Sequence, residues 1–258
     1  VGVVLSGGGA KGVAHIGVLQ VLEKAGIPVD VIVGTSMGSI VGGLYAIGYS
    51  ADQLDSLVRV QDWMFLLSDK VNRYDLPFGE KEQDGKYLLS LPFDRGKKRP
   101  SGFISGQNVY NLFSDLTVGY HDSLDFLQLP IPFACVAADL FQREEIVMTS
   151  GNLVQAMRAS MAIPGVFTPV RTGNRVLVDG GILNNFPTDV ARRLGAEIVI
   201  GPGRFDEGRQ AGVRLRRDTA NHQPPLHEQA RGKRATCRPR HSSRRERLLG
   251  RQFQRPLD

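Results

Sequence analysis

Two short apolar runs near the start of the chain each lead through a glycine-rich turn into a helical pattern. These two successive patterns constrain the fold more than any other feature. The first run is Val1–Leu5, followed by a glycine loop at 6–12. The second is Val31–Val33, followed by a turn at 34–38. Strand, helix, strand, helix at this spacing indicates a right-handed βαβ unit and therefore a parallel sheet.

The same alternation continues to about residue 201. Further strands are predicted at 131–138, 145–148, 176–178 and 197–200, and helices over 13–25, 37–47, 105–116, 153–162 and 187–194, with Ser105 and Ser50 as helix caps. We therefore predict an α/β fold in which a mostly parallel central sheet is flanked by helices. The regularity fades between Gln61 and Ser101, where Trp63–Leu67 and the loop after it form either a lid or ordinary core with a surface insertion.

The positive net charge of the chain belongs to its last part. Residues 202–258 hold fifteen Lys and Arg against six Asp and Glu, whereas residues 1–201 hold seventeen against twenty. No apolar period survives after Gly201, which indicates either a disordered, solvated tail or an out-of-frame translation. We predict one domain at 1–201 and an Arg-rich tail at 202–258. We expect no specific nucleic-acid partner, because the basic pI depends on the tail alone.

Several classes of protein are excluded by the sequence. The stretch 31–51 carries no charge, but its five glycines make it less apolar than a membrane span. Cys135 and Cys237 match no metal-binding spacing, and no carboxylate or histidine cluster does either, so we expect no metal and no cofactor. The chain begins at Val1 without Met, and the sequence leaves the compartment, cytoplasmic or cell-envelope, unassigned.

The turn Gly34-Thr35-Ser36-Met37-Gly38 has the pattern G-x-S-x-G between a predicted strand and a predicted helix. Such a turn lifts a serine hydroxyl clear of the backbone, and its glycines allow close approach and unusual dihedral angles. The N-terminus of the following helix favours a developing oxyanion. Ser36 is therefore a candidate nucleophile, and a glycine-rich packing turn is the alternative.

The loop Gly7-Gly8-Gly9-Ala10-Lys11-Gly12 admits three uses. A P-loop requires Lys after the last glycine, where Val13 stands. A dinucleotide fingerprint fits the glycine spacing, but its acidic residue should end the second strand and Asp30 precedes that strand. An oxyanion hole fits best, because adjacent parallel strands bring the loop beside Ser36. A phosphate- or nucleotide-binding α/β protein that uses the loop 7–12 is the alternative function.

A nucleophilic serine needs a proton acceptor. Two of the five histidines lie before the tail: we expect His15 to be packed or at the surface, and His121 to be solvated. Asp179, at a strand end and followed by Gly180-Gly181, is a better-placed base, although a turn-forming Asp-Gly is the alternative. The unpatterned tail is a poor place for a positioned base, and it holds the remaining histidines, His222, His227 and His241.

Together these motifs resemble the patatin-like phospholipase family. The resemblance covers about residues 1–201 and rests on G-G-G-x-K-G at 7–12, G-x-S-x-G at 34–38 and D-G-G at 179–181, in that order. The block Arg158–Gly165 also looks like the family's segment upstream of its aspartate. The chain departs from the family after Gly201, where further helices are expected.

The resemblance implies a three-layer catalytic domain over 1–201 and a serine–aspartate acyl hydrolase, acting on lipid or phospholipid at a membrane surface without a cofactor. Some bacterial members carry a signal peptide before this domain and an outer-membrane barrel after it, so the resemblance allows such a fusion in a longer protein. It assigns Ser36 as nucleophile, Asp179 as base, the amides of Gly7, Gly8 and Gly9 as oxyanion donors, and Gly12, Gly34, Gly38, Gly180 and Gly181 as motif glycines.

Overall fold

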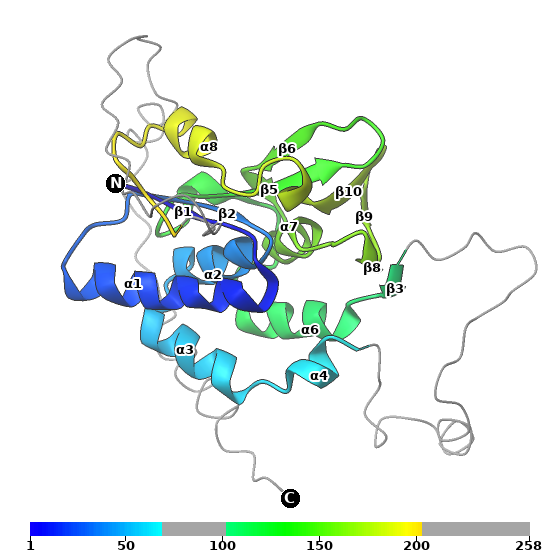
Figure 1. Ribbon diagram of the computed structural model, residues 1–258, viewed down its shortest axis with the longest axis horizontal. Coiled ribbons are helices and arrows are strands. Elements are labelled where there is room, and N and C mark those ends of the chain that lie inside the picture. The colour runs from blue at the N-terminus through cyan, green and yellow to red at the C-terminus, as the bar shows by residue number, and fades with distance from the viewer. Residues whose placement is uncertain (69–101, 203–258) are drawn as a thin grey trace, which may run out of the picture.

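The computed structural model describes residues 1–68 and 102–202, and in these residues a seven-stranded sheet carries helices on both faces (Figure 1). The strands of this sheet are β1 (Gly2–Leu5), β2 (Val31–Thr35), β5 (Phe133–Asp139), β6 (Glu145–Met148), β9 (Val170–Thr172), β10 (Arg175–Asp179) and β11 (Val199–Ile200). Two small sheets pair β3 (Gly102–Ile104) with β8 (Gly165–Phe167), and β4 (Leu124–Asp125) with β7 (Ser150–Gly151). The helices are α1 (Ala14–Lys24), α2 (Met37–Ala46), α3 (Ala51–Val60), α4 (Trp63–Leu66), α6 (Gln107–Leu116), α7 (Leu153–Ser160) and α8 (Thr188–Arg193), with short 3₁₀ helices η1 (Gly9–Val13), η2 (Phe126–Gln128) and η3 (Gly180–Ile182).

The central sheet is mixed and mostly parallel. Strands β11, β1, β2 and β5 lie side by side and run parallel to one another. Strands β6 and β10 are antiparallel to β5, and β9 is antiparallel to β10. The predicted fold class is confirmed, and the predicted βαβ unit corresponds to β1, α1 and β2.

Strand β5 brings the ends of two other strands together. Val136 of β5 pairs with Thr35 of β2, and the next residue, Ala137, pairs with Asp179 of β10. Strand β6 pairs with both Val136 and Ala137, so it occupies one edge of β5 there and leaves the other edge to β2 and β10. Because β2 is parallel and β10 antiparallel to β5, the two strands run toward each other and their carboxyl ends meet.

Alternate residues of the central strands face two different cores, as the pleat of a sheet requires. In β1, Val3 and Leu5 belong to the larger core, to which α1, α2, α3, α6 and α7 contribute. Val4, between them, packs in a smaller core with Val190 and Ala191 of α8. Figure 1 shows α8 on one side of the sheet and α1, α2 and α3 on the other. Because both faces are covered, the strands read as continuous apolar runs.

Most of the predicted helices lie close to where the sequence placed them. Ser50 caps α3 as predicted, in a capping box with Gln53. The cap predicted at Ser105 is wrong by one residue. Gly106, with φ of 74°, is the cap of α6, and the Ser105 hydroxyl accepts from the Gln107 N–H at 3.3 Å.

Two of the hypotheses drawn from the sequence fall mainly outside the described residues. These are the Arg-rich tail beyond Pro202 and the loop 69–101 that belonged to the suggested lid, so the domain division at 201 stays a prediction. The first part of the suggested lid is helix α4, in which Met64 is largely exposed. Within 1–68 and 102–202, no helix combines the length and the apolar character needed to cross a bilayer.

We predict that Gly38→Ala destabilises the fold, because α2 crosses the end of β1 at Gly38. A methyl group there would overlap the backbone carbonyl of Leu5, which cannot move aside as a side chain can. Overpacking in a well-packed core costs roughly 1–3 kcal/mol. We therefore expect the free energy of unfolding to fall by about 1–3 kcal/mol, measured by chemical denaturation.

Gly17→Ala is the matched control for this substitution. Gly17 is exposed within α1, and no neighbouring atom lies within 4 Å of an added Cβ. Alanine there should raise the free energy of unfolding by about 0.5–1 kcal/mol, since glycine is the poorer helix former. An equal stability for Gly38→Ala and wild type would contradict the close crossing of α2 and β1.

Candidate active site

Ser36 lies in a sharp turn between β2 and α2, in a backbone conformation that residues other than glycine rarely adopt. Its φ is 53° and its ψ is −122°, which is a strained combination for a residue with a Cβ atom. The neighbouring glycines make the turn possible: a Cβ at Gly34 would lie 2.6 Å from the Cα of Ser39. The turn thus has the geometry that the G-x-S-x-G motif predicts.

Ser160, at the end of α7, fixes the strained turn to the sheet. The Ser36 N–H donates to Oγ of Ser160 at 2.9 Å, and that hydroxyl donates to the carbonyl of Val136 at 2.6 Å. All three residues are buried, so the two bonds satisfy polar groups that water does not reach. The sequence analysis included Ser160 in the block 158–165 but gave it no role.

The Ser36 hydroxyl donates a hydrogen bond to Oδ2 of Asp179 over 2.7 Å. Both residues are at most 7% exposed. The other carboxylate oxygen, Oδ1, accepts from the N–H of Gly181 at 2.7 Å. The carboxylate is therefore held in place, with one oxygen on the hydroxyl and the other on the backbone.

Burial raises the pKa of Asp179 above its ordinary value, because the carboxylate loses hydration at this depth. The hydrogen bonds from Ser36 and Gly181 act in the opposite direction and offset part of that rise in pKa. An aspartate has an ordinary pKa of about 3.9 and is a weak base. Its burial beside Ser36 makes it a stronger one.

The glycine loop turns from β1 into η1 directly beside Ser36. A Cβ at Gly7 would lie 3.0 Å from the Cβ of Ser36. The Gly7 N–H already donates to the carbonyl of Asn185 at 3.3 Å. Among the described residues, the N–H groups of Gly8 and Gly9 have no acceptor. Of the three amides expected from the sequence to be oxyanion donors, that of Gly7 is already bonded, and those of Gly8 and Gly9 are left to bind an anion.

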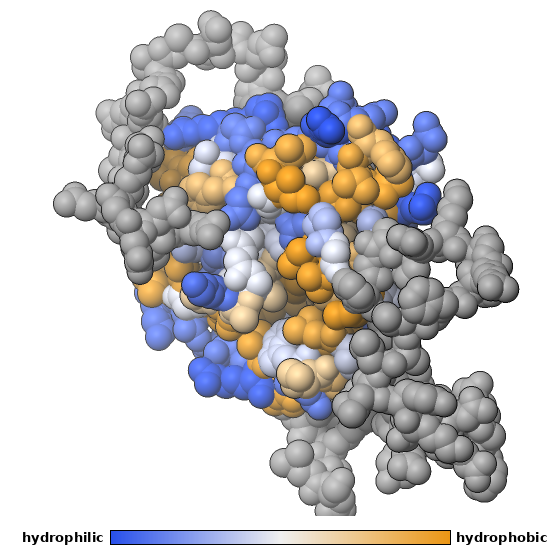
Figure 2. Space-filling view, turned by 45° about the vertical axis from the view of Figure 1, so that its right-hand side comes forward, coloured by the Kyte–Doolittle hydropathy of each residue, from blue (hydrophilic) through white to orange (hydrophobic). Residues whose placement is uncertain are grey.

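A cleft of about 980 Å³ opens over Ser36 and Asp179. The glycine loop forms part of its wall, together with the apolar residues Ile163, Pro164 and Ile182. Ile163 and Ile182 are 40% and 57% exposed, which makes part of the rim apolar. Figure 2 shows that apolar residues also gather in patches elsewhere on the surface it displays. An apolar cleft of this size suits an organic ligand with a hydrocarbon part.

Among the described residues, no histidine contacts the Ser36 hydroxyl. His15 is buried in α1, lines the same cleft, and donates from Nε2 to the carbonyl of Ser6 at 2.7 Å. Burial lowers the pKa of His15, which favours the neutral imidazole. His121 is exposed, as expected. Outside the described residues lie His222, His227 and His241.

The structure agrees with the sequence argument against a dinucleotide site, which depends on the position of Asp30. Asp30 precedes β2 and pairs with the amino group of Val1. The glycine loop follows the carboxyl end of β1, and β1 runs parallel to β2. Asp30 lies at the amino end of the parallel strands and the glycine loop at their carboxyl end. Asp30 therefore cannot contact a ribose bound at the loop.

The part of the chain that the structure describes holds no group of three or more His, Cys, Asp or Glu side chains arranged to bind a metal ion. Cys135 lies fully buried in β5, and burial raises the pKa of its thiol. A thiol in such surroundings is a structural side chain and not a reactive one.

Strain at Ser36 and burial of Asp179 both reduce stability, and such features are typical of nucleophilic chemistry and unusual in a packing turn. At the level of class, the fold and the site are those of an α/β serine hydrolase. The family follows from a comparison of the sequence with known families. Residues 3–192 match the model of the patatin-like phospholipases, and the chain belongs to the patatin-like phospholipase family.

Curated relatives agree with this membership. The chain is 35% identical over 202 residues to a patatin-like phospholipase domain-containing protein of Caenorhabditis elegans, and 33% identical over 202 residues to patatin-like phospholipase domain-containing protein 6 of Homo sapiens. It is 33% identical over 189 residues to an uncharacterized NTE family protein of Mycobacterium tuberculosis. These matches cover 78%, 78% and 73% of this chain but 13%, 13% and 27% of the relatives, so the chain spans a small part of their length. Among solved structures, VipD from Legionella pneumophila is similar over 72% of this chain and 46% of that one, with a TM-score of 0.47 and 19% identity.

We predict that the reactivity of Ser36 has an acidic limb set by Asp179. Below its pKa the carboxyl group carries a proton and cannot accept another from Ser36. The rate at which a fluorophosphonate labels Ser36 should therefore fall about tenfold per pH unit below that pKa, with a midpoint above the ordinary value of about 3.9. Intact-protein mass spectrometry across pH measures this rate.

Asp179→Asn is the control for the acidic limb. The amide keeps the shape of the side chain but cannot accept a proton, so labelling should be slow at every pH and the limb should disappear. A wild-type rate that stays constant down to pH 4 in folded protein would contradict the assignment of Asp179.

Proposed function

We propose that this protein is a lipid acyl hydrolase of the phospholipase A or esterase type, which cleaves carboxylic esters of lipids through an acyl-Ser36 intermediate with Asp179 as the base. The observation that carries the proposal is the 2.7 Å hydrogen bond from the Ser36 hydroxyl to Asp179, beside the glycine loop. The family membership supports the substrate class, because the family is named for phospholipase activity.

In the first half of the reaction, Asp179 accepts the hydroxyl proton as Oγ of Ser36 attacks the ester carbonyl. The negative charge that develops on the carbonyl oxygen is stabilised by the amides of Gly8 and Gly9. The tetrahedral intermediate then collapses, and the protonated Asp179 returns the proton to the departing alcohol. An acyl ester on Ser36 remains.

In the second half, water takes the place of the alcohol. Asp179 removes a proton from the water as its oxygen attacks the acyl-Ser36 carbonyl, and the same amides stabilise the second oxyanion. When this intermediate collapses, Ser36 regains the proton and the fatty acid leaves. The raised pKa of Asp179 assists both halves, because the carboxylate must hold a proton in each intermediate.

The cleft wall supports a substrate with an acyl chain. Ile163, Pro164 and Ile182 line the cleft beside Ser36 and Asp179. The hydrocarbon part of a lipid ester is stabilised by contact with such side chains, at about 0.8 kcal/mol for each buried methylene. We therefore propose lipid or phospholipid at a membrane surface as the substrate.

We predict that Ser36→Ala abolishes hydrolysis of chromogenic esters while the protein stays folded. Loss of a covalent nucleophile lowers the rate by about 10⁴-fold or more. The measurement uses a series of esters of increasing acyl length, with circular dichroism as the test of folding. For wild type, kcat/KM should rise with acyl length.

Ser56→Ala is the matched control for this test. Ser56 is an exposed serine on α3 that donates to the Asp52 carbonyl and does not line the cleft. Its substitution should leave the rate at the wild-type value. Near-normal turnover by folded Ser36→Ala would rule out the acyl-enzyme.

We predict that His15→Gln retains activity within about tenfold of wild type, since loss of a true general base costs roughly 10²–10⁴-fold. His15 is the histidine that lines the cleft, and glutamine keeps a donor for the Ser6 carbonyl. The measurement is kcat/KM of His15→Gln and wild type on the ester of the series that wild type hydrolyses fastest. A loss as large as that of Ser36→Ala would show that the base is His15.

A further inference from the structure

Two consecutive asparagines after Asp179 form hydrogen bonds with the turn that holds Ser36 and with the glycine loop. The Asn184 carbonyl accepts from the Thr35 hydroxyl at 3.0 Å. The Asn185 carbonyl accepts from the Gly7 N–H, and Nδ2 of Asn185 donates to the Gly7 carbonyl, both at 3.3 Å. One residue therefore binds both backbone groups of Gly7.

The side chain of Asn185 is also packed between two of the motif glycines. A Cβ at Gly7 would lie 2.5 Å from Oδ1 of Asn185, and a Cβ at Gly181 would lie 2.9 Å from the same atom. Both positions must therefore lack a side chain if the Asn185 amide is to stay where it is. The position of the Asn185 amide therefore explains why both Gly7 and Gly181 are glycines.

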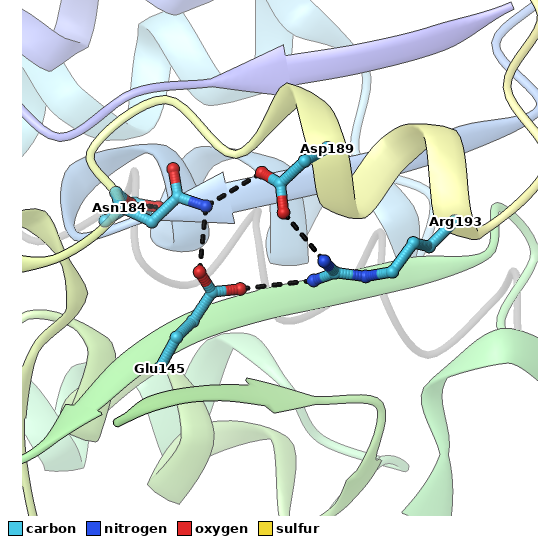
Figure 3. A network of polar contacts seen from close by, with 5 residues as sticks. Glu145, Asn184, Asp189 and Arg193 are labelled. Atoms are coloured by element: carbon cyan, nitrogen blue, oxygen red, sulfur yellow. Dashed lines mark hydrogen bonds and ion pairs between the residues drawn. The ribbon is translucent and has the colours of Figure 1, made fainter. Parts of the chain in front are cut away.

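A network of side chains holds Asn184, the residue before Asn185 (Figure 3). Nδ2 of Asn184 donates to Glu145 of β6 at 2.9 Å and to Asp189 of α8 at 2.8 Å. Arg193 of α8 bridges the same two carboxylates, at 2.8 Å to Asp189 and 3.3 Å to Glu145. The segment that carries Asn185 is thus anchored to a strand and to a helix.

The geometry of the peptide bond links Asn185 to the proposed oxyanion donors. The Gly7 carbonyl and the Gly8 N–H belong to one planar trans peptide unit and point in opposite directions. A hydrogen bond that fixes the direction of the Gly7 carbonyl therefore fixes the direction of the Gly8 N–H. Three successive glycines have few constraints of their own, so this orientation must come from a neighbour.

We propose that Asn185 is the positioning residue of the oxyanion hole. It aims the Gly8 N–H, and through it the start of η1 at Gly9, at the carbonyl oxygen that becomes the oxyanion when Ser36 attacks the ester. The role rests on the proposed function. Asn185 lines the cleft, but its hydrogen bonds are to Gly7, so its effect through Gly8 falls on the oxyanion of the transition state. Asn185 should therefore affect kcat and leave KM unchanged.

The experiment compares wild type with Asn185→Ala and Asn185→Asp on a soluble chromogenic ester. Misplacing an oxyanion donor should lower kcat by about 10- to 100-fold, with KM unchanged. Asn185→Asp keeps the side-chain volume and loses the Nδ2 donor, so its loss should be at least as large. It also supplies the measurement if the alanine variant does not fold.

A reversible inhibitor separates positioning from a general loss of structure. A trifluoromethyl ketone forms a tetrahedral adduct with a serine hydroxyl, and the adduct carries the oxyanion. Its inhibition constant should rise by the same factor by which kcat falls, whereas that of the corresponding secondary alcohol, which forms no adduct, should not change. Equal changes for ketone and alcohol would overturn the proposal.

Asn152→Ala is the matched control, because Asn152 also makes two side-chain hydrogen bonds. It accepts from Gln155 N–H at 2.9 Å as the cap of α7, and it donates to the His121 carbonyl at 2.7 Å. Loss of this cap should lower the melting temperature and leave kcat and the ratio of the ketone and alcohol inhibition constants unchanged.

The outcomes distinguish this inference from the function on which it rests. If Ser36→Ala is inactive and the Asn185 variants keep wild-type kcat, the positioning role is wrong and the hydrolase stands. If a folded wild-type chain neither hydrolyses the ester series nor binds the ketone, both are wrong.

Discussion

The site depends on one feature of the sheet: β2 and β10 pair with the same side of β5, at adjacent residues. Because β2 ends opposite Val136 and β10 ends opposite Ala137, the residues Ser36 and Asp179 emerge at the same point from opposite directions. The Val136 carbonyl also accepts from Ser160, whose hydroxyl holds the Ser36 N–H. A Cβ at Gly180 would overlap that carbonyl, so the glycine after Asp179 is required by the same contact.

This arrangement carries two energetic costs that the rest of the fold must offset. Ser36 occupies a strained conformation, which costs of order 1–3 kcal/mol. The raised pKa of Asp179 means that the folded state holds its proton more tightly than the unfolded state does. The free energy of unfolding therefore falls as the pH rises through the folded pKa of Asp179, because burial destabilises the ionised carboxylate. The ionised form is also the one that can act as a base. The apolar layers on both faces of the sheet supply the compensating free energy.

The sequence predicts the parts of this structure that local patterns determine. The strand–turn–helix units, the class of the sheet and the strained turn at Ser36 follow from apolar runs and glycine spacing. The short strands β3, β4, β7, β8 and β9 are not predicted, because two or three residues are too few to show a period. The hydrogen bonds that Ser160 makes to Ser36 and Val136, and those between Asn185 and Gly7, are also missed. Their partners lie far away in the chain, and no spacing within the sequence marks such residues.

Hydrogen bonds between residues far apart in the chain also join the three glycine motifs to one another. Gly7 binds Asn185 across 178 residues, Thr35 binds Asn184 across 149, and Ser36 binds Asp179 across 143. The contact between Ser36 and Asp179 requires β10 to join β5, and the two asparagine contacts also require the following loop to return to the ends of β1 and β2. Closing loops of this length is costly in entropy. A chain ending soon after Asp179 would hold Ser36 and Asp179 and still lack Asn185, which binds both backbone groups of Gly7. The site is thus a property of the completed sheet, even though each motif is recognisable in isolation.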